Sequence, residues 1–182
     1  MELVKKIESA NIFKKIALVL FGTLLLTISA KIKVPFYPVP MTMQTFVVVL
    51  IGITLGWKLG LITVFAYLFE GGIGLPVFAG TPEKGIGISY MMGPTGGYLV
   101  GFVSSVFIAG FVNLNRNLFI KFLLISLSVF AIYLTGVPWL AHLAGWEIAY
   151  VWGVKNFVLA ELFKIAILAI SAEKLLKIRK FI

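Results

Sequence analysis

Residues 41–69, MTMQTFVVVLIGITLGWKLGLITVFAYLF, decide the fold of this chain. Lys58 is the only charged residue in this stretch, and a bilayer crossing needs about 20 mostly apolar residues per helix. We predict two helices, 41–56 and 57–69, joined by so tight a break that they must be antiparallel neighbours. The stretch therefore forms a helical hairpin inside a membrane.

The rest of the chain has the same composition. Of its 182 residues, 60% are hydrophobic and 13% are charged, with a mean hydropathy of +1.06, whereas about a quarter of a soluble domain is charged. This length allows about five to seven crossings with short connections. We therefore predict an all-α membrane protein in the lipid bilayer, with residues 1–182 forming a single domain.

The formal charge of +9 would suggest nucleic acid as the partner of a soluble protein. In a membrane protein, however, the placement of lysine and arginine first reports orientation. No nucleic-acid partner is therefore expected.

Four further apolar runs bring the predicted number of transmembrane helices to six. A mixed, basic segment at 1–15 precedes the first run and could lie along the membrane surface. The four runs are 16–30, 98–112, 118–135 and 157–176.

Two connections are predicted to be irregular. Pro35, Pro38 and Pro40 prevent a helix in the loop after the first span. The stretch 70–97 is rich in glycine and proline but remains apolar, and such backbone is tolerated at membrane depth only where it is covered by protein or lines a cavity. This second loop is a candidate binding loop.

Cations fall mainly on one side of the six-helix topology, eleven against four. The positive-inside rule then places both termini in the cytoplasm. The eleven are Lys5, Lys6, Lys14, Lys15, Lys58, Arg116, Lys121, Lys174, Lys177, Arg179 and Lys180, and the four are Lys31, Lys33, Lys84 and Lys155.

The sequence lacks the residues that several kinds of chemistry require. The chain has no cysteine, no aspartate and one histidine, so neither a metal site nor a cofactor is expected. It also lacks the phosphate-binding loop pattern of nucleotide hydrolases. Any active transport must therefore draw its energy from elsewhere.

Glu161 and Lys164 lie inside the last apolar run, three residues apart on one helix face. Each charge costs about 2.5 to 3.5 kcal/mol in a membrane helix, so the two need a mutual partner or a polar ligand. Such a pair suits a neutral head group with N–H and C=O edges, or a carboxylate on Lys164. The alternative is a helix-end pair that reaches outward to water.

Gln44 is an uncharged donor and acceptor that could complete this site or could join helices by hydrogen bonds. Small residues recur at four-residue spacing and predict close helix packing. They are Gly52, Gly56, Gly60, Gly97, Gly101, Ser105 and Ala109.

At several places the sequence resembles the BioY family, the biotin-binding S components of energy-coupling-factor (ECF) transporters. The resemblance rests on VPMTMQTFVVVLIG, LFEGGIGLPVFAG, GPTGGYLVGF, GVPWLA and the Glu161/Lys164 pair, in unbroken order over residues 17–172. It implies a six-helix bundle in a prokaryotic cell membrane that holds biotin towards the outside. In the family an aspartate is usual where this chain has Glu161.

The resemblance also implies site residues and partners. Gln44, Tyr90 and Tyr98 join Glu161 and Lys164 in the biotin pocket, with the tyrosine rings over the apolar part of the ligand. A transmembrane coupling subunit and a pair of cytoplasmic ATPases are the implied partners. No A-x-x-x-A pattern occurs on the first helix, so its contact with the coupling subunit is predicted at Gly22, Thr23, Thr27 or Ala30.

Two other functions stay open at this point. One is an S component for a different vitamin. The other is a membrane-embedded enzyme acting on a lipid or acyl substrate, with Glu161 as general base assisted by His142 or Lys164.

Overall fold

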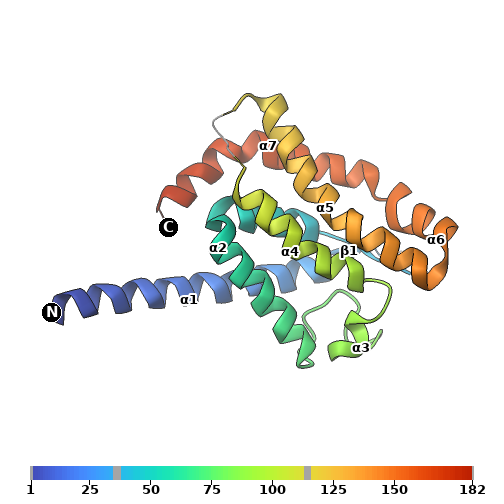
Figure 1. Cartoon of the computed structure of the whole chain (residues 1–182), viewed down its shortest axis with the longest axis horizontal. Helices are drawn as coiled ribbons and strands as arrows, with labels where there is room; N and C mark the ends of the chain where they lie inside the picture. Colours follow the sequence, from blue (N-terminus) through green and yellow to red (C-terminus); the bar gives the residue numbers. More distant parts are fainter. Residues whose placement is uncertain (1, 35–37, 113–115, 182) are drawn as a thin grey trace.

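The computed structural model describes residues 2–34, 38–112 and 116–181, and it is an all-α membrane protein (Figure 1). Its long helices are α1 (Glu2–Lys31), α2 (Gln44–Gly72), α4 (Gly96–Gly110), α5 (Leu118–Ala144) and α7 (Val158–Phe181). The short elements are β1 (Lys33–Val34), β2 (Met41–Thr42), α3 (Gly87–Met91), α6 (Trp146–Tyr150) and the π-helix η1 (Val151–Lys155).

The predicted hairpin is present within α2. Gly56 has φ 73° and ψ 173°. This positive φ interrupts the helix and divides α2 into two halves. The halves then fold back on each other, because a Cβ placed on Gly60 would lie 3.6 Å from the Cα of Gly52. The chain therefore reverses at the glycine that separates the two predicted helices.

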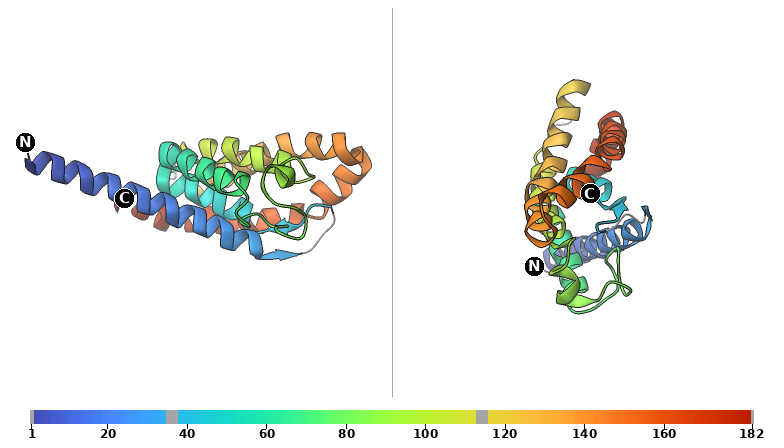
Figure 2. Two further views of the ribbon diagram at one scale, coloured as in Figure 1. Left: turned by 90° about the horizontal axis from the view of Figure 1, so that it is seen from below. Right: turned by 90° about the vertical axis from the view of Figure 1, so that its right-hand side faces the viewer.

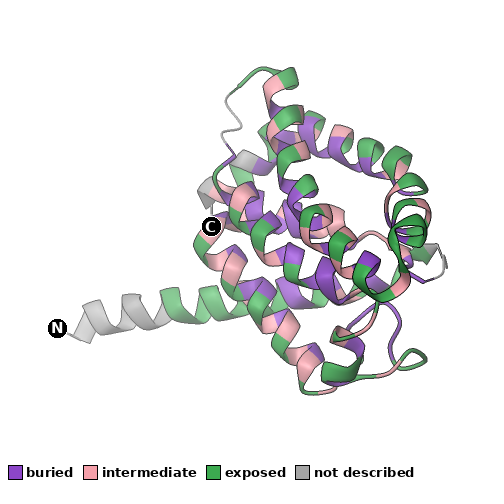
Figure 3. Cartoon of the chain, turned by 45° about the vertical axis from the view of Figure 1, so that its right-hand side comes forward, coloured by how far each residue is buried: buried purple, intermediate pink, exposed green. Residues whose placement is uncertain are grey.

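Each long helix has exposed residues (Figure 3), and many of them are large apolar residues. Three helical stretches are long and apolar enough to cross a membrane, 11–31, 44–72 and 118–144, and α4 is a shorter apolar helix. Exposed apolar residues on such stretches include Leu20, Phe65 and Leu134. A surface of this kind is suited to lipid contact.

Helix α1 runs without a break from Glu2 to Lys31. The structure therefore has no helix boundary between the basic segment at 1–15 and the first apolar run. No glycine or proline occurs before Gly22, and nothing in the sequence therefore interrupts the helix. Its N-terminal part projects beyond the other helices (Figure 2).

The predicted contact positions on α1 face the interior of the bundle. Gly22, Thr23 and Ala30 are buried, and a Cβ on Gly22 would lie 2.5 Å from the side chain of Thr63 in α2. Thr27 is half-buried and donates its hydroxyl to the carbonyl of Thr23. These residues pack α1 against its own chain, so the prediction of an exposed partner surface there is wrong for the three buried ones.

The fifth predicted span is longer than expected. Helix α5 continues past the predicted end at residue 135, through Pro138, to Ala144. Membrane helices tolerate proline because neighbouring groups satisfy the freed backbone. The chain then turns at Gly145, whose φ is 88°, into α6 and η1.

The loop between α1 and α2 is non-helical in its described residues, as predicted, while residues 35–37 lie outside them. Lys33 pairs with Thr42 and Val34 with Met41, forming a two-residue antiparallel ladder that the sequence analysis missed. Helix α2 consequently begins at Gln44 rather than at residue 41. The connection between α4 and α5 falls largely on 113–115, which are also outside the described residues.

Candidate binding site

A cavity lies among α2, α4, α5 and α7 and is covered on one side by the β1–β2 loop. It has about 530 Å³ of space without atoms when its open mouth is included. Four of the five predicted site residues line it: Gln44, Tyr90, Tyr98 and Glu161. Its other walls are largely apolar and include Val39, Leu99, Phe102, Ile132 and Phe157.

Glu161 and Lys164 form an ion pair inside the bundle. The Nζ of Lys164 lies 2.8 Å from the Oε1 of Glu161, and their side chains are only 9% and 8% exposed. The alternative of a pair that reaches outward to water is therefore wrong. An ion pair this deeply buried requires further hydrogen bonds to offset its desolvation.

Lys164 uses its donors within the protein. Its Nζ donates to the carbonyl of Thr42 at 2.6 Å and to the Oγ1 of Thr45 at 3.0 Å, in addition to Glu161. A lysine ammonium has three N–H donors, and these contacts account for all of them. Lys164 does not line the cavity, so it positions Glu161 and the loop rather than facing the open space.

The two oxygens of Glu161 differ. Oε1 accepts hydrogen bonds from Lys164 and from the hydroxyl of Thr45, the latter at 2.9 Å. Oε2 is buried and accepts no hydrogen bond from the described residues. A buried carboxylate oxygen without a donor is costly, so this oxygen retains the capacity to accept a hydrogen bond.

Gln44 connects the cavity wall to the core. Its Nε2 donates to the hydroxyl of Tyr67 at 2.7 Å, and that hydroxyl donates to the carbonyl of Val77 at 3.0 Å. Thr42 donates to the Oε1 of Gln44 at 3.3 Å. The amide therefore joins segments of the fold by hydrogen bonds while one side of the residue borders the cavity.

The two predicted tyrosines are held with their rings at the cavity wall. The hydroxyl of Tyr90 accepts from the backbone N–H of Gly80 at 3.1 Å, and its ring stacks on Phe78. Tyr98 donates to the carbonyl of Gly153 in η1 at 3.0 Å. Both hydroxyls are engaged in the protein, which leaves ring surface for an apolar part of a ligand.

The sequence analysis missed several residues of this site, including Thr42, Thr45 and Tyr133. Thr42 and Thr45 flank Gln44 and meet the Glu161/Lys164 pair from the other end of the chain. Their closeness to Gln44 in MTMQT was a usable signal, since hydroxyl residues at a helix start near a buried charge can bond it. Tyr133 also lines the cavity, and nothing in its sequence surroundings indicates that.

His142, suggested as a catalytic partner of Glu161, is not part of this site. His142 is exposed and does not line the cavity. Among the described residues, no group of three or more His, Cys, Asp or Glu side chains could hold a metal ion.

A second hollow lies on the outer side of the bundle between α5 and α7. It holds about 1110 Å³ of space without atoms, including open surroundings, and its walls are almost entirely apolar. Glu161 and Tyr133 line both this groove and the internal cavity. They therefore form part of the wall between the two spaces.

The fold and the cavity define a class of protein: a helical membrane protein that encloses a small, mostly apolar cavity with one buried charge pair. Residues 4–181 match the BioY family, and the chain belongs to that family.

Its relatives share most of their length with it. The "Probable biotin transporter BioY" of Pyrococcus horikoshii is 39% identical over 162 residues, covering 89% of this chain and 96% of the relative. The "Biotin transporter BioY" of Thermotoga maritima is 36% identical over 160 residues, covering 86% and 92%.

A solved structure has the same fold. The crystal structure of the S-component for biotin from an ECF-type ABC transporter superposes with a TM-score of 0.77 at 25% identity. The match covers 92% of this chain and 93% of the other.

Proposed function

We propose that this chain binds biotin in the internal cavity as the substrate-binding subunit of an ECF-type vitamin transporter in the cell membrane. The relatives described as biotin transporters and the biotin S-component of the same fold support this proposal. The cavity supports it independently through the polar groups in its mostly apolar wall.

One observation carries the choice of ligand: the buried Oε2 of Glu161 has no donor among the described residues, at the wall of a mostly apolar cavity. This oxygen calls for an N–H donor. Biotin carries a neutral ureido ring with two N–H groups, and its sulfur ring and aliphatic chain suit the rings of Tyr90 and Tyr98. The ureido group would therefore lie at Glu161.

Gln44 and Lys164 take different parts in this proposal. Gln44 borders the cavity and offers its Oε1, whose contact with Thr42 is long at 3.3 Å. Lys164 acts through Glu161, whose carboxylate it holds in place at 2.8 Å.

Six membrane crossings form part of the proposal: α1, the two halves of α2, α4, α5 and α7. The N-terminal end of α1 and the C-terminal end of α7 lie at the same end of the bundle (Figures 1 and 2). The excess of cations would place that end in the cytoplasm. The halves of α2 are shorter than a full crossing of about 20 residues, which requires a locally thinned bilayer.

Energy for uptake would come from partners. The chain lacks a phosphate-binding loop, so a transmembrane coupling subunit and cytoplasmic ATPases would supply the driving force.

Calorimetric titration of biotin into the purified protein in detergent tests the proposal. We expect tight binding that weakens about 30-fold or more in Glu161→Gln, since the new amide presents N–H groups to the ligand N–H. Glu147→Gln is the matched control, because Glu147 is exposed and does not line the cavity.

Two results would overturn the proposal. If the folded wild-type protein binds another vitamin but not biotin, the ligand is wrong. If biotin or an acyl substrate is chemically converted without partners, the chain is an enzyme.

A further inference from the structure

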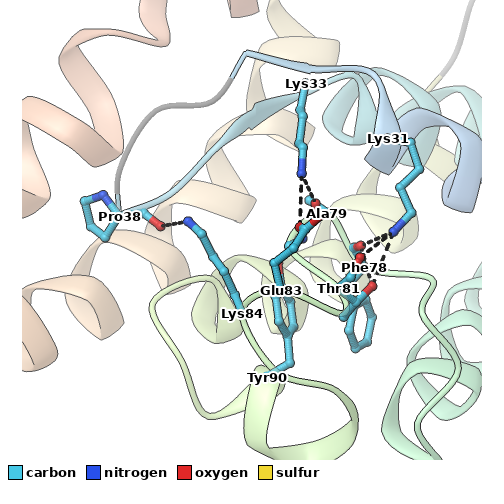
Figure 4. Close-up of polar contacts among 10 residues, drawn as sticks. Lys31, Lys33, Pro38, Phe78, Ala79, Thr81, Glu83, Lys84 and Tyr90 are labelled. Carbon is cyan, nitrogen blue, oxygen red and sulfur yellow. Dashed lines mark hydrogen bonds and ion pairs between the residues drawn. The ribbon is translucent and has the colours of Figure 1, made fainter.

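The wall of the cavity differs between its loop side and the side of the α5/α7 groove. On the loop side, polar contacts tie the covering segments together; for example, Lys33 donates to the carbonyl of Ala79 at 2.8 Å (Figure 4). On the other side, Glu161 and Tyr133 line both the cavity and the groove. At these two residues, a single layer of side chains separates the cavity from the outside of the bundle.

The rim of the groove is apolar and exposed on both helices. Phe130 and Leu134 of α5 are 58% and 62% exposed, and Val158 and Leu162 of α7 are 48% and 45% exposed. Helix α5 is long and apolar enough to cross a membrane. Because hydrocarbon surrounds such a helix in the bilayer, the groove opens towards lipid tails.

An empty groove of this kind would be costly in a bilayer. Side chains that line an unfilled space lose dispersion contacts on that side. Water would not fill the groove well either, because its walls are almost entirely apolar and a bound water needs two or more polar partners. A flexible hydrocarbon chain restores the contacts and needs no polar partner.

A second protein helix suits the groove less well than a lipid chain does. Membrane helices pack closely through small residues, as Gly101 of α4 does against Ile132 of α5. Among the described residues that line the groove, Ser126 is the only glycine, alanine or serine. The groove therefore lacks the small residues that a close helix contact uses.

We propose that the hydrocarbon chain of one membrane lipid lies in the groove between α5 and α7 and completes the wall behind Glu161 and Tyr133. The inference goes beyond the proposed function, because it does not depend on which molecule the cavity binds. The chain keeps water away from the outer side of Glu161, and the attraction between Glu161 and Lys164 is stronger where water is excluded. The lipid thus supports the ion pair that helps to hold α7.

Native mass spectrometry of the full chain tests this inference, after reconstitution with dioleoylphosphatidylcholine and transfer to a mild detergent. We expect one lipid to stay bound to each wild-type chain. Val158→Phe should reduce the retained lipid about tenfold, because its ring fills part of the groove and removes on the order of ten carbon contacts of the chain. Val137→Phe, from the opposite wall of the groove, should act in the same way.

Val100→Phe is the matched control. Val100 is an exposed valine of α4, 57% exposed, and does not line the groove. Its variant should retain as much lipid as the wild type. Tryptophan-fluorescence melting of each sample establishes that the protein compared is folded.

Three results would overturn the inference. The folded wild type retains no lipid, or both groove variants retain as much lipid as Val100→Phe, which places the lipid elsewhere on the surface. A dimer that carries no lipid and dissociates in the groove variants would make a second copy of the chain the occupant. Biotin titration of the same samples is a separate measurement, so each of these results leaves the proposed function intact.

Discussion

Helix α4 meets α2 and α5 through small residues, whereas α7 adds a buried ion pair and hydroxyl contacts to its apolar contact with the same two helices, beside an open groove. A Cβ on Gly101 of α4 would lie 2.7 Å from the Cα of Ile132 in α5, and one on Gly52 of α2 would lie 2.7 Å from the carbonyl of Val106 in α4. On the other side, Glu161 bonds Thr45 and borders the groove.

The difference distinguishes the helices that form a rigid scaffold from the helix that carries the charged part of the site. Backbones in such close contact can shift little without clashes, so α2, α4 and α5 fix the positions of Gln44 and Tyr98. Helix α7 packs through apolar residues and is held in addition by directional polar bonds, whose partners a ligand can compete for. The polar side of the bundle thus carries the group that is open to a ligand, and the glycine side holds it in place.

Lys164→Met should give the largest effect on stability, because it leaves Glu161 buried without its cation. Breaking a buried pair costs about 3–5 kcal/mol, which lowers Tm by about 10 °C for a chain of this size. Tryptophan-fluorescence melting of the protein in detergent measures it, with exposed Lys155→Met as control.

The double variant Glu161→Gln/Lys164→Met should recover most of the lost Tm, because no unpaired charge remains. A decrease of less than about 3 °C in Lys164→Met would mean that α7 is not held by its polar bonds, and the comparison would fail on that side.

Gly101→Ala should give the next largest effect. Its Cβ meets backbone atoms of Ile132 that cannot rotate away, and overpacking of this kind costs about 1–3 kcal/mol. Gly72→Ala is the matched control, since the nearest atom to its Cβ is the Met91 sulfur at 3.7 Å. Equal melting temperatures for the two variants would contradict tight packing at α4.

Enlarging valine to leucine should have the smallest effect where the bundle is open. Val137 is half-buried at the groove beside α7, so Val137→Leu should change stability by less than about 0.5 kcal/mol. Val106, fully buried in α4 against Gly60, should lose about 1–3 kcal/mol as Val106→Leu. Similar Tm shifts for both would remove the distinction between the two sides.

The sequence predicted the helices of the scaffold more completely than it predicted the loops between them. Long apolar runs and Gly56 indicated the helices and the reversal within α2, since both follow from local composition. The continuation of α5 through Pro138 was missed, because it depends on membrane packing rather than on local preference. The β1–β2 ladder was also missed, as two-residue strands carry no periodic pattern.

The candidate site was predictable in part for a related reason. The spacing of Glu161 and Lys164 places them together on any helix, so their pairing could be predicted. Their bonds to Thr42 and Thr45 span 122 and 116 residues of sequence, which no local pattern encodes. The burial that turns the pair into a site arises from the tertiary structure alone.

These long-range bonds also bear on how the protein is made. A helix carrying Glu161 and Lys164 enters the bilayer at a cost of about 2.5 to 3.5 kcal/mol for each charge, and the hydroxyl and carbonyl groups that offset it belong to Thr42 and Thr45. The ribosome synthesises those groups first and α7 last. Earlier helices that are already assembled therefore lower the cost of inserting α7 into the bilayer.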